Sequence, residues 1–179
     1  MREPSIEIRI LTASDAAAFW HLRLEGLERE AAAFGASADE HRSCSVGETV
    51  ARIEPSDDQF VVGAFADGVL RGVVGFARDH GAKRRHRGVV WGVYVGPELR
   101  GKGVAQRLLE TLIQRAREIA GLERLVLAAN AADPKATGLY RRVGFVPFGC
   151  EPHALKIGDS YVDDEHMTLD LTVIGGETQ

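Results

Sequence analysis

The residues best suited to chemistry in this sequence fall in the range 93–105, where a predicted strand ends, a glycine-rich turn follows and an amphipathic helix begins. The first N–H groups of a helix have no partner inside it, and the helix dipole favours an anion in front of them. Gly101 and Gly103 allow the backbone to approach a ligand closely. These features predict a cradle for a diphosphate, to which Arg100 and Lys102 can add positive charge.

Two common diphosphate-binding motifs do not fit this segment. A P-loop requires the pattern G-x-x-x-x-G-K-[ST], which is absent. The dinucleotide fingerprint G-x-G-x-x-G/A begins correctly at Gly101 but fails at Gln106. A nucleotide-dependent oxidoreductase is therefore a weak alternative. The pattern that the segment does contain is Arg100-x-x-Gly103-x-Ala105.

Three neighbouring features extend this pattern. The residues Val93-Tyr94-Val95 precede a proline, and Asn130 ends the next predicted strand. The range 136–145 reads A-x-x-L-Y-x-x-x-G-F. With these features the chain resembles the GCN5-related N-acetyltransferase (GNAT) family, over about residues 5–171.

The resemblance implies acetyl-CoA as the acyl donor and no metal. It implies that neighbouring strands part near Val93 and Val95, which then form strand-like hydrogen bonds with the pantetheine arm. Phe34 and Trp91 are expected to bind the acceptor. The implied cofactor-binding residues are Val93, Tyr94, Val95, Arg100, Gly101, Lys102, Gly103, Val104, Ala105, Asn130 and Tyr140.

The implied reaction is direct attack of an amine on the thioester within a ternary complex. A primary amine has a pKa of about 10.4, so it must lose a proton before it can attack at neutral pH. Tyr140 is the candidate for protonating the departing thiolate, because a neutral phenol can serve as the donor. A backbone N–H near Tyr94 or Val95 is expected to hold the oxyanion.

The general base is less clearly indicated. Some relatives carry a glutamate on the central strand, but the range 87–95 contains no carboxylate. We rank Glu25 first because of its place in the acceptor-side helix. The alternatives are a water relay or another of several side chains, namely Glu40, His80, His86 and Asp163.

Composition limits the other classes of function. The 179 residues are 45% hydrophobic and 27% charged, with a formal net charge of −4, so nothing indicates nucleic-acid or membrane binding. We find no signal peptide and no transmembrane segment. Cys44 and Cys150 form neither a disulfide framework nor a zinc site, and the histidines lack ligand spacing. We therefore expect a cytoplasmic protein without a metal.

Hydrophobic periodicity predicts a single α/β domain over residues 1–179. Predicted helices cover about 16–32, 46–53, 104–120 and 134–143, and predicted strands cover about 6–10, 59–65, 70–76, 89–95, 125–129, 145–148 and 161–171. Three consecutive strands exclude a purely parallel sheet. The expected fold is the GNAT-like three-layer sandwich: a mixed, mostly antiparallel sheet split into a V, with helices on both faces.

The sequence leaves the acceptor open. It could be a small-molecule amine or an amine of a peptide or protein. The alternative function is a non-catalytic acyl-CoA sensor or partner-binding module, which the missing strand carboxylate keeps open. The resemblance also makes a homodimer an expectation.

Overall fold

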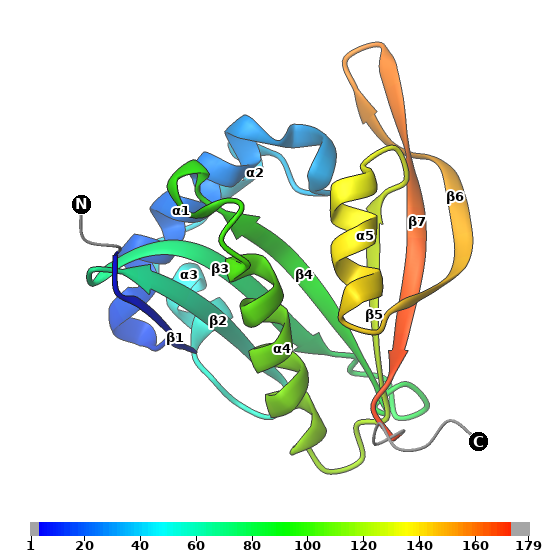
Figure 1. The fold of residues 1–179 in the computed structure, drawn as a ribbon, viewed down its shortest axis with the longest axis horizontal. Helices are drawn as coiled ribbons and strands as arrows, with labels where there is room; N and C mark the ends of the chain where they lie inside the picture. Colours follow the sequence, from blue (N-terminus) through cyan, green and yellow to red (C-terminus); the bar gives the residue numbers. More distant parts are fainter. Residues whose placement is uncertain (1–3, 173–179) are drawn as a thin grey trace.

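The computed structural model describes residues 4–172, which form one seven-stranded sheet with helices on both faces (Figure 1). The strands are β1 (Ile6–Ile10), β2 (Gln59–Ala66), β3 (Val69–Arg78), β4 (Arg87–Val95), β5 (Arg124–Asn130), β6 (Val146–Ile157) and β7 (Ser160–Asp170). The helices are α1 (Ala16–Arg29), α2 (Ala38–Arg42), α3 (Val46–Ile53), α4 (Val104–Arg117) and α5 (Pro134–Arg142).

The strand order is β1-β2-β3-β4-β5-β7-β6, and only β4 and β5 are parallel neighbours. Two-residue turns connect β2 to β3 and β6 to β7. The β2–β3 turn places Asp67 and Gly68 at φ 48° and 81°, the left-handed pair that a two-residue hairpin requires. The mixed, mostly antiparallel sheet predicted from the sequence is confirmed.

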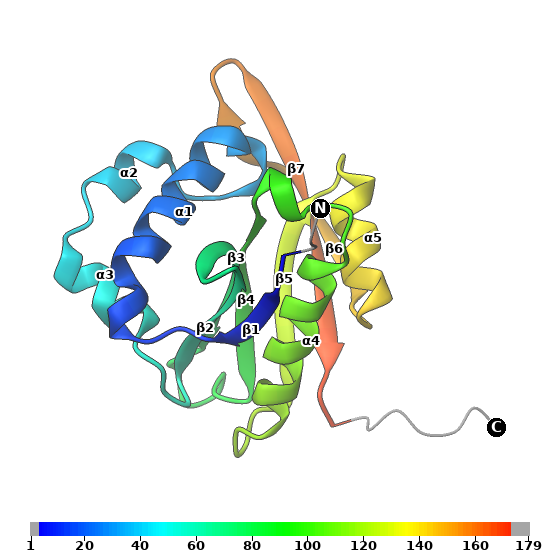
Figure 2. The ribbon, with the colours of Figure 1, turned by 60° about the vertical axis from the view of Figure 1, so that its left-hand side comes forward.

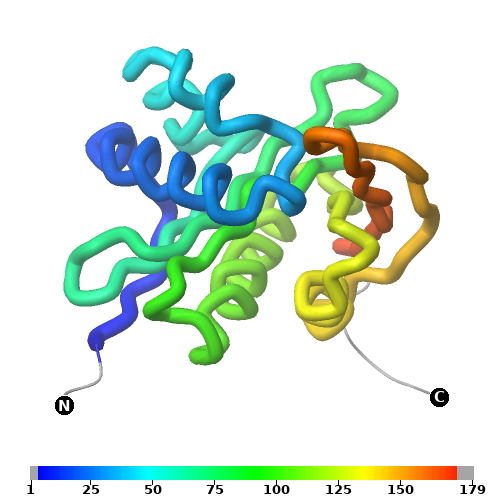
Figure 3. Tube along the Cα trace, turned by 90° about the horizontal axis from the view of Figure 1, so that it is seen from above, coloured from blue at the N-terminus to red at the C-terminus, as the bar shows by residue number. Residues whose placement is uncertain are grey.

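Two apolar cores fill the layers on either side of the sheet. Helices α1, α2 and α3 cover one face, and α4 and α5 cover the other (Figures 2 and 3). Phe76 and Leu108 are fully buried on the α4 side, while Phe19 is buried on the α1 side. Successive side chains of β4 divide between the two cores, Val93 packing on the α4 side and Tyr94 on the α1 side.

The sheet opens between its two parallel strands. β4 and β5 pair over three residue pairs only, ending at Val89 and Val126. Beyond this point β4 carries a bulge, where the pairing with β3 shifts between Val73 and Gly75 and Gly92 has a φ of 66°. The V-shaped split expected from the resemblance is therefore present, and it faces the start of α4.

Some boundaries differ from the sequence prediction. The first helix was predicted to reach Ala32 but ends at Arg29, after which Ala31–Ala33 forms a short 3-10 helix. Helix α2 was not predicted. It begins at a capping box in which the Ser37 hydroxyl accepts from the amide of Glu40 and the Glu40 carboxylate accepts from the amide of Ser37.

Candidate active site

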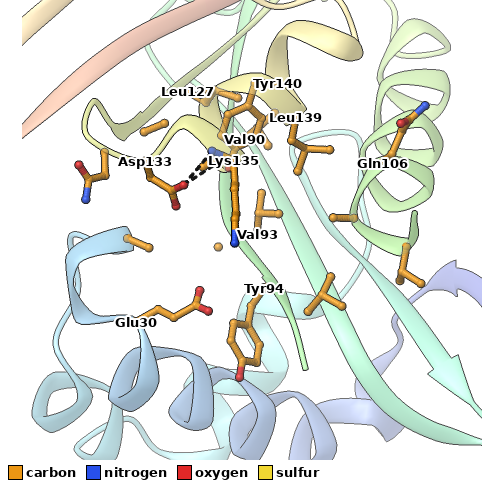
Figure 4. A pocket seen from close by; sticks show the side chains of 18 of the residues that line it. Glu30, Val90, Val93, Tyr94, Gln106, Leu127, Asp133, Lys135, Leu139 and Tyr140 are labelled. Carbon is orange, nitrogen blue, oxygen red and sulfur yellow. Dashed lines mark hydrogen bonds between the residues drawn. The ribbon is translucent and has the colours of Figure 1, made fainter. Parts of the chain in front are cut away.

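A cavity of about 680 Å³ lies in the split of the sheet, with β4 and β5 both contributing to its wall (Figure 4). The start of α4, the inner face of α5 and the segment that follows α1 complete the wall. All the site residues predicted from the sequence line this cavity except Glu25 and Lys102. Segments distant in the sequence thus converge on one site.

The turn before α4 has the geometry of an anion cradle. Gly101 and Gly103 have φ values of 74° and 72°, which favour glycine, and nothing lies within 4 Å of where a Cβ would stand at either residue. The first hydrogen bond of the helix runs from the amide of Arg107 to the carbonyl of Gly103, at 3.1 Å. The amides of residues 104–106 therefore have no partner inside the helix and suit the diphosphate of CoA.

Arg100 and Lys102 do not both face the cradle. The Arg100 guanidinium donates to the Val95 carbonyl at 3.0 Å and pairs with the Glu30 carboxylate at 2.5 Å. Its main contact is thus with the segment after α1, which it ties to the end of β4. Lys102 is exposed and lies outside the cavity wall. Backbone donors consequently supply most of the cradle.

Tyr140, on α5, is 9% exposed and lines the cavity. Burial, and then the negative charge of Asp133, raises the pKa of the Tyr140 phenol well above its usual value. The hydroxyl therefore stays protonated at neutral pH, as a proton donor must. Asp133 also begins α5, since its carboxylate accepts from the amides of Lys135 at 3.0 Å and Ala136 at 3.2 Å.

Asn130, at the end of β5, both turns the chain and lines the cavity. Its side-chain oxygen accepts from the amide of Ala132 at 2.9 Å, and its carbonyl accepts from the amide of Asp133 at 3.0 Å. The turning role that Asn favours is thus present. Because the oxygen is used, the carboxamide nitrogen is the group left to donate to a ligand.

Glu25 and Tyr94 form a pair at the boundary between α1 and β4. The Tyr94 hydroxyl donates to the Glu25 carboxylate at 2.9 Å, and Arg29 lies 3.4 Å from the same carboxylate oxygen. Figure 4 shows the Tyr94 hydroxyl turned away from the cavity, whereas Glu30 points its carboxylate toward it. Glu25 therefore lies behind the Tyr94 ring, and Glu30 is the carboxylate on the wall.

Several charged wall residues were not found from the sequence. Besides Glu30 they are Asp133, Lys135 and Arg142. Figure 4 shows the Lys135 side chain reaching from α5 toward Val93. Asp133 precedes Tyr140 by seven residues, which places both on one side of α5, so helical spacing could have found it. Lys135 and Arg142 lie on the same helix but not at a spacing that shares the Tyr140 face, so the sequence pattern carried no signal for them.

Comparison with known proteins matches the fold and the site. The model of the acetyltransferase (GNAT) family matches residues 23–145, which include the cradle, the split strands and α5. The chain belongs to this family. The GNAT resemblance drawn from the range 93–145 is thus confirmed.

Individual relatives match this GNAT chain over part or all of its length. An L-methionine sulfoximine/L-methionine sulfone acetyltransferase of Pseudomonas aeruginosa is 38% identical over 44% of this chain and 45% of its own. A spermidine N(1)-acetyltransferase of Vibrio cholerae is 30% identical over 47% of this chain and 49% of its own. The matched segment thus spans about half of each relative. A Salmonella typhimurium structure that contains acetyl-CoA as its cofactor has a TM-score of 0.79 at 22% identity, covering 97% of this chain and 98% of that one.

Residues 4–172 offer neither a membrane-spanning helix nor a cluster of metal ligands. No helix in that range is long and apolar enough to cross a membrane. Nor does that range contain a group of three or more His, Cys, Asp or Glu side chains placed to hold a metal ion.

Proposed function

We propose that this GNAT protein transfers the acetyl group of acetyl-CoA to an amine by direct attack within a ternary complex. The observation that carries the proposal is the cavity in the sheet, since it joins the cradle at α4 to the buried phenol of Tyr140. Acetyl-CoA supplies an activated acetyl thioester when bound. That the Salmonella typhimurium structure contains acetyl-CoA supports this choice of donor.

The residues of the chain divide the work by position. The amides that begin α4 bind the diphosphate, and the free edge of β4 at Val93 and Val95 binds the pantetheine arm. Asn130 donates to the same arm. A backbone N–H near Tyr94 or Val95 holds the oxyanion oxygen, and Tyr140 gives its proton to the sulfur.

Removal of the proton from the acceptor falls to a carboxylate near the α1 end of the cavity. Glu25 is our first choice, acting through the Tyr94 hydroxyl that it already binds, once that hydroxyl turns toward the acceptor. Glu30 is the second, because its side chain lines the cavity directly. Both lie on the side of β4 where the acceptor must enter if CoA occupies the side of α4.

The acceptor is proposed here as an amine only. The Pseudomonas aeruginosa relative is named for L-methionine sulfoximine and L-methionine sulfone, and the Vibrio cholerae relative for spermidine. Methionine sulfone carries an amine and a carboxylate, whereas spermidine carries amines alone. The two names therefore agree on the reacting group and disagree on the rest of the molecule.

Release of free CoA thiol from acetyl-CoA, measured with and without amines, tests the proposal. The panel contains L-methionine sulfone, spermidine, a lysine-containing peptide and a peptide with a free N-terminus. We expect amine-dependent thiol release with at least one member. CoA binding without release on a broad amine panel would instead favour the alternative of a non-catalytic acyl-CoA-binding protein.

A further inference from the structure

Arg23, on α1, carries a buried charge that the acetyl transfer described above does not use. The side chain is 6% exposed, and its Nε and Nη1 atoms have no hydrogen-bond partner. Burial, and then the nearby charge of Arg52, lowers the pKa of Arg23 to about 10, so the group remains a cation at neutral pH. A buried cation with unpaired donors is unfavourable unless a partner arrives.

The surroundings of Arg23 are aromatic and positively charged. Its guanidinium lies 4.9 Å from the centre of the Phe34 ring and 5.5 Å from that of Trp91. The guanidinium of Arg52, on α3, lies 4.9 Å from the centre of the Trp91 ring. Within residues 4–172 neither arginine forms an ion pair with a carboxylate. Aromatic faces attract the charge but cannot accept its in-plane N–H groups, so the site still lacks an acceptor of hydrogen bonds.

The guanidinium lies directly behind the wall of the active-site cavity. A Cβ at Gly92 would stand 2.9 Å from Arg23 Nη1, so the bulge in β4 leaves room for the cation against the strand. Gly92, Trp91 and Phe34, which all contact Arg23, also line the cavity. Arg23 thus lies on the α1 side of β4, opposite the α4 side that holds the CoA cradle.

We propose that Arg23 binds a carboxylate of the acceptor, so that the substrate is an amine that also carries a carboxylate, as an amino acid does. This inference rests on the proposed acetyl transfer. The planar guanidinium matches a carboxylate in two parallel hydrogen bonds. An acceptor with cationic groups alone would meet the unpaired charges of Arg23 and Arg52 and is disfavoured.

Contact requires the Phe34 ring to move aside, because this ring covers the guanidinium. Phe34 belongs to the short segment between α1 and α2, and the next residue is Gly35. Nothing lies within 4 Å of where a Cβ would stand at Gly35. A glycine next to Phe34 puts few steric limits on the backbone torsions that would move the ring.

Matched acceptors test this role. Thiol release is measured with L-leucine, L-leucinamide and isopentylamine, and again with L-phenylalanine, its amide and phenethylamine. Acids and amides differ in amine pKa, so their kcat/KM values are not compared directly. The readout is how much the ratio of kcat/KM for an acid to kcat/KM for its amide changes between wild type and Arg23→Met. We expect Arg23→Met to lower this ratio roughly 10- to 100-fold, mainly through KM for the acids. Arg117→Met, at an exposed position on α4, is the matched control and leaves the ratio unchanged.

Binding and stability readouts separate this inference from the proposed function. Arg23→Met removes a buried unpaired charge while retaining most of the side-chain stem, so we expect its Tm without ligand to rise. CoA binding, measured by calorimetry, should be the same in wild type and variant. If the wild type fails to bind CoA, the proposed acetyl transfer is rejected but the role of Arg23 is not. That role is then tested by whether each acid raises the Tm of the protein more than its amide does.

Three results would overturn the role of Arg23. One is an equal loss of kcat/KM with acids and amides. Another is a lower Tm in Arg23→Met, which would indicate a structural role. The third is a wild-type protein that neither acetylates nor is stabilised by any carboxylate in the set more than by its amide.

Discussion

The Tyr94 hydroxyl donates a 2.9 Å hydrogen bond to the carboxylate of Glu25, joining the end of β4 to α1. The Tyr94 ring lines the active-site cavity, and Glu25 lies behind it, 3.4 Å from Arg29. Glu25 can therefore reach an acceptor amine only through the Tyr94 hydroxyl or after a side-chain movement. Glu30 needs neither, but its carboxylate is already paired with Arg100.

Replacement of each carboxylate by its amide distinguishes the two candidates for the base. We expect Glu25→Gln to lower kcat roughly 10²-fold at pH 7, because proton removal then lacks its acceptor. The loss should be smaller at pH 9, where more of the amine is already unprotonated. The measurement is the pH–rate profile of thiol release. Glu30→Gln serves as the comparison, and a larger, pH-dependent loss in that variant would assign the base to Glu30.

The same hydrogen bond predicts how stability depends on alkaline pH. Burial, and then the bond to Glu25, raises the pKa of Tyr94 to about 12 from its usual 10. The folded state therefore holds this proton more tightly than the unfolded state. The resulting contribution to stability is complete below pH 10 and is lost as the pH rises toward about 12.

Urea unfolding between pH 9 and pH 11.5 measures this dependence. We expect the free energy of unfolding of the wild type to fall more steeply with pH than that of Tyr94→Phe, which lacks the ionisable hydroxyl. Other groups that titrate in this range are common to both proteins and cancel in the difference. Parallel curves would show that neither burial nor the contact with Glu25 raises the pKa of the Tyr94 phenol.

Removal of the Tyr140 hydroxyl should separate chemistry from binding. We expect Tyr140→Phe to lower kcat roughly 10²-fold, because the departing sulfur then lacks its proton donor. The Kd for CoA should change little, since the cradle lies at α4. Thiol-release kinetics and CoA calorimetry on the same preparation check both statements.

A control for stability is built into this substitution. The Tyr140 ring lies edge-on to Phe145, with ring centres 6.2 Å apart, and phenylalanine preserves that packing. The Tm of Tyr140→Phe should therefore stay close to that of the wild type. Unchanged kcat with a lowered Tm would make Tyr140 a packing residue and remove it from the mechanism.

Local signals in the sequence predicted those parts of the fold that depend on local physics. The apolar stripe that starts at Val104 indicates the start of α4, and Asp133-Pro134 is the cap and first-turn proline typical of a helix start, because caps and periodicity act within a few residues. Asp67-Gly68 is likewise typical of the tight turn found between β2 and β3. The split between β4 and β5 came from the family resemblance, since no local rule requires two strands to part.

The missed features depend on contacts between distant segments. Glu30 faces the cavity because α1 ends at Arg29 and the chain turns there, whereas the periodic pattern continued to Ala32. Arg23 lies on the apolar stripe of α1, four residues after Phe19 and four before Leu27, so helical spacing indicates its burial. Only the packing of α1 against the Gly92 bulge shows that its donors lack partners. Sequence patterns identify charges, but they do not show which of them lack partners.

Binding of the CoA diphosphate by the amides at the start of α4 underlies both the donor site and the proposed reaction, and calorimetric titration with CoA measures it. Gly103→Asp places a carboxylate in the cradle and strains a residue at φ 72°, and we expect it to weaken binding by roughly 10²-fold or more. Gly158→Asp is the matched control, because Gly158 has a φ of 60° and open surroundings in the β6–β7 turn. We expect the wild type and Gly158→Asp to bind CoA and Gly103→Asp to lose this binding. A wild type that does not bind CoA, or a Gly103→Asp variant that binds it as the wild type does, would show that the α4 amides do not hold the diphosphate.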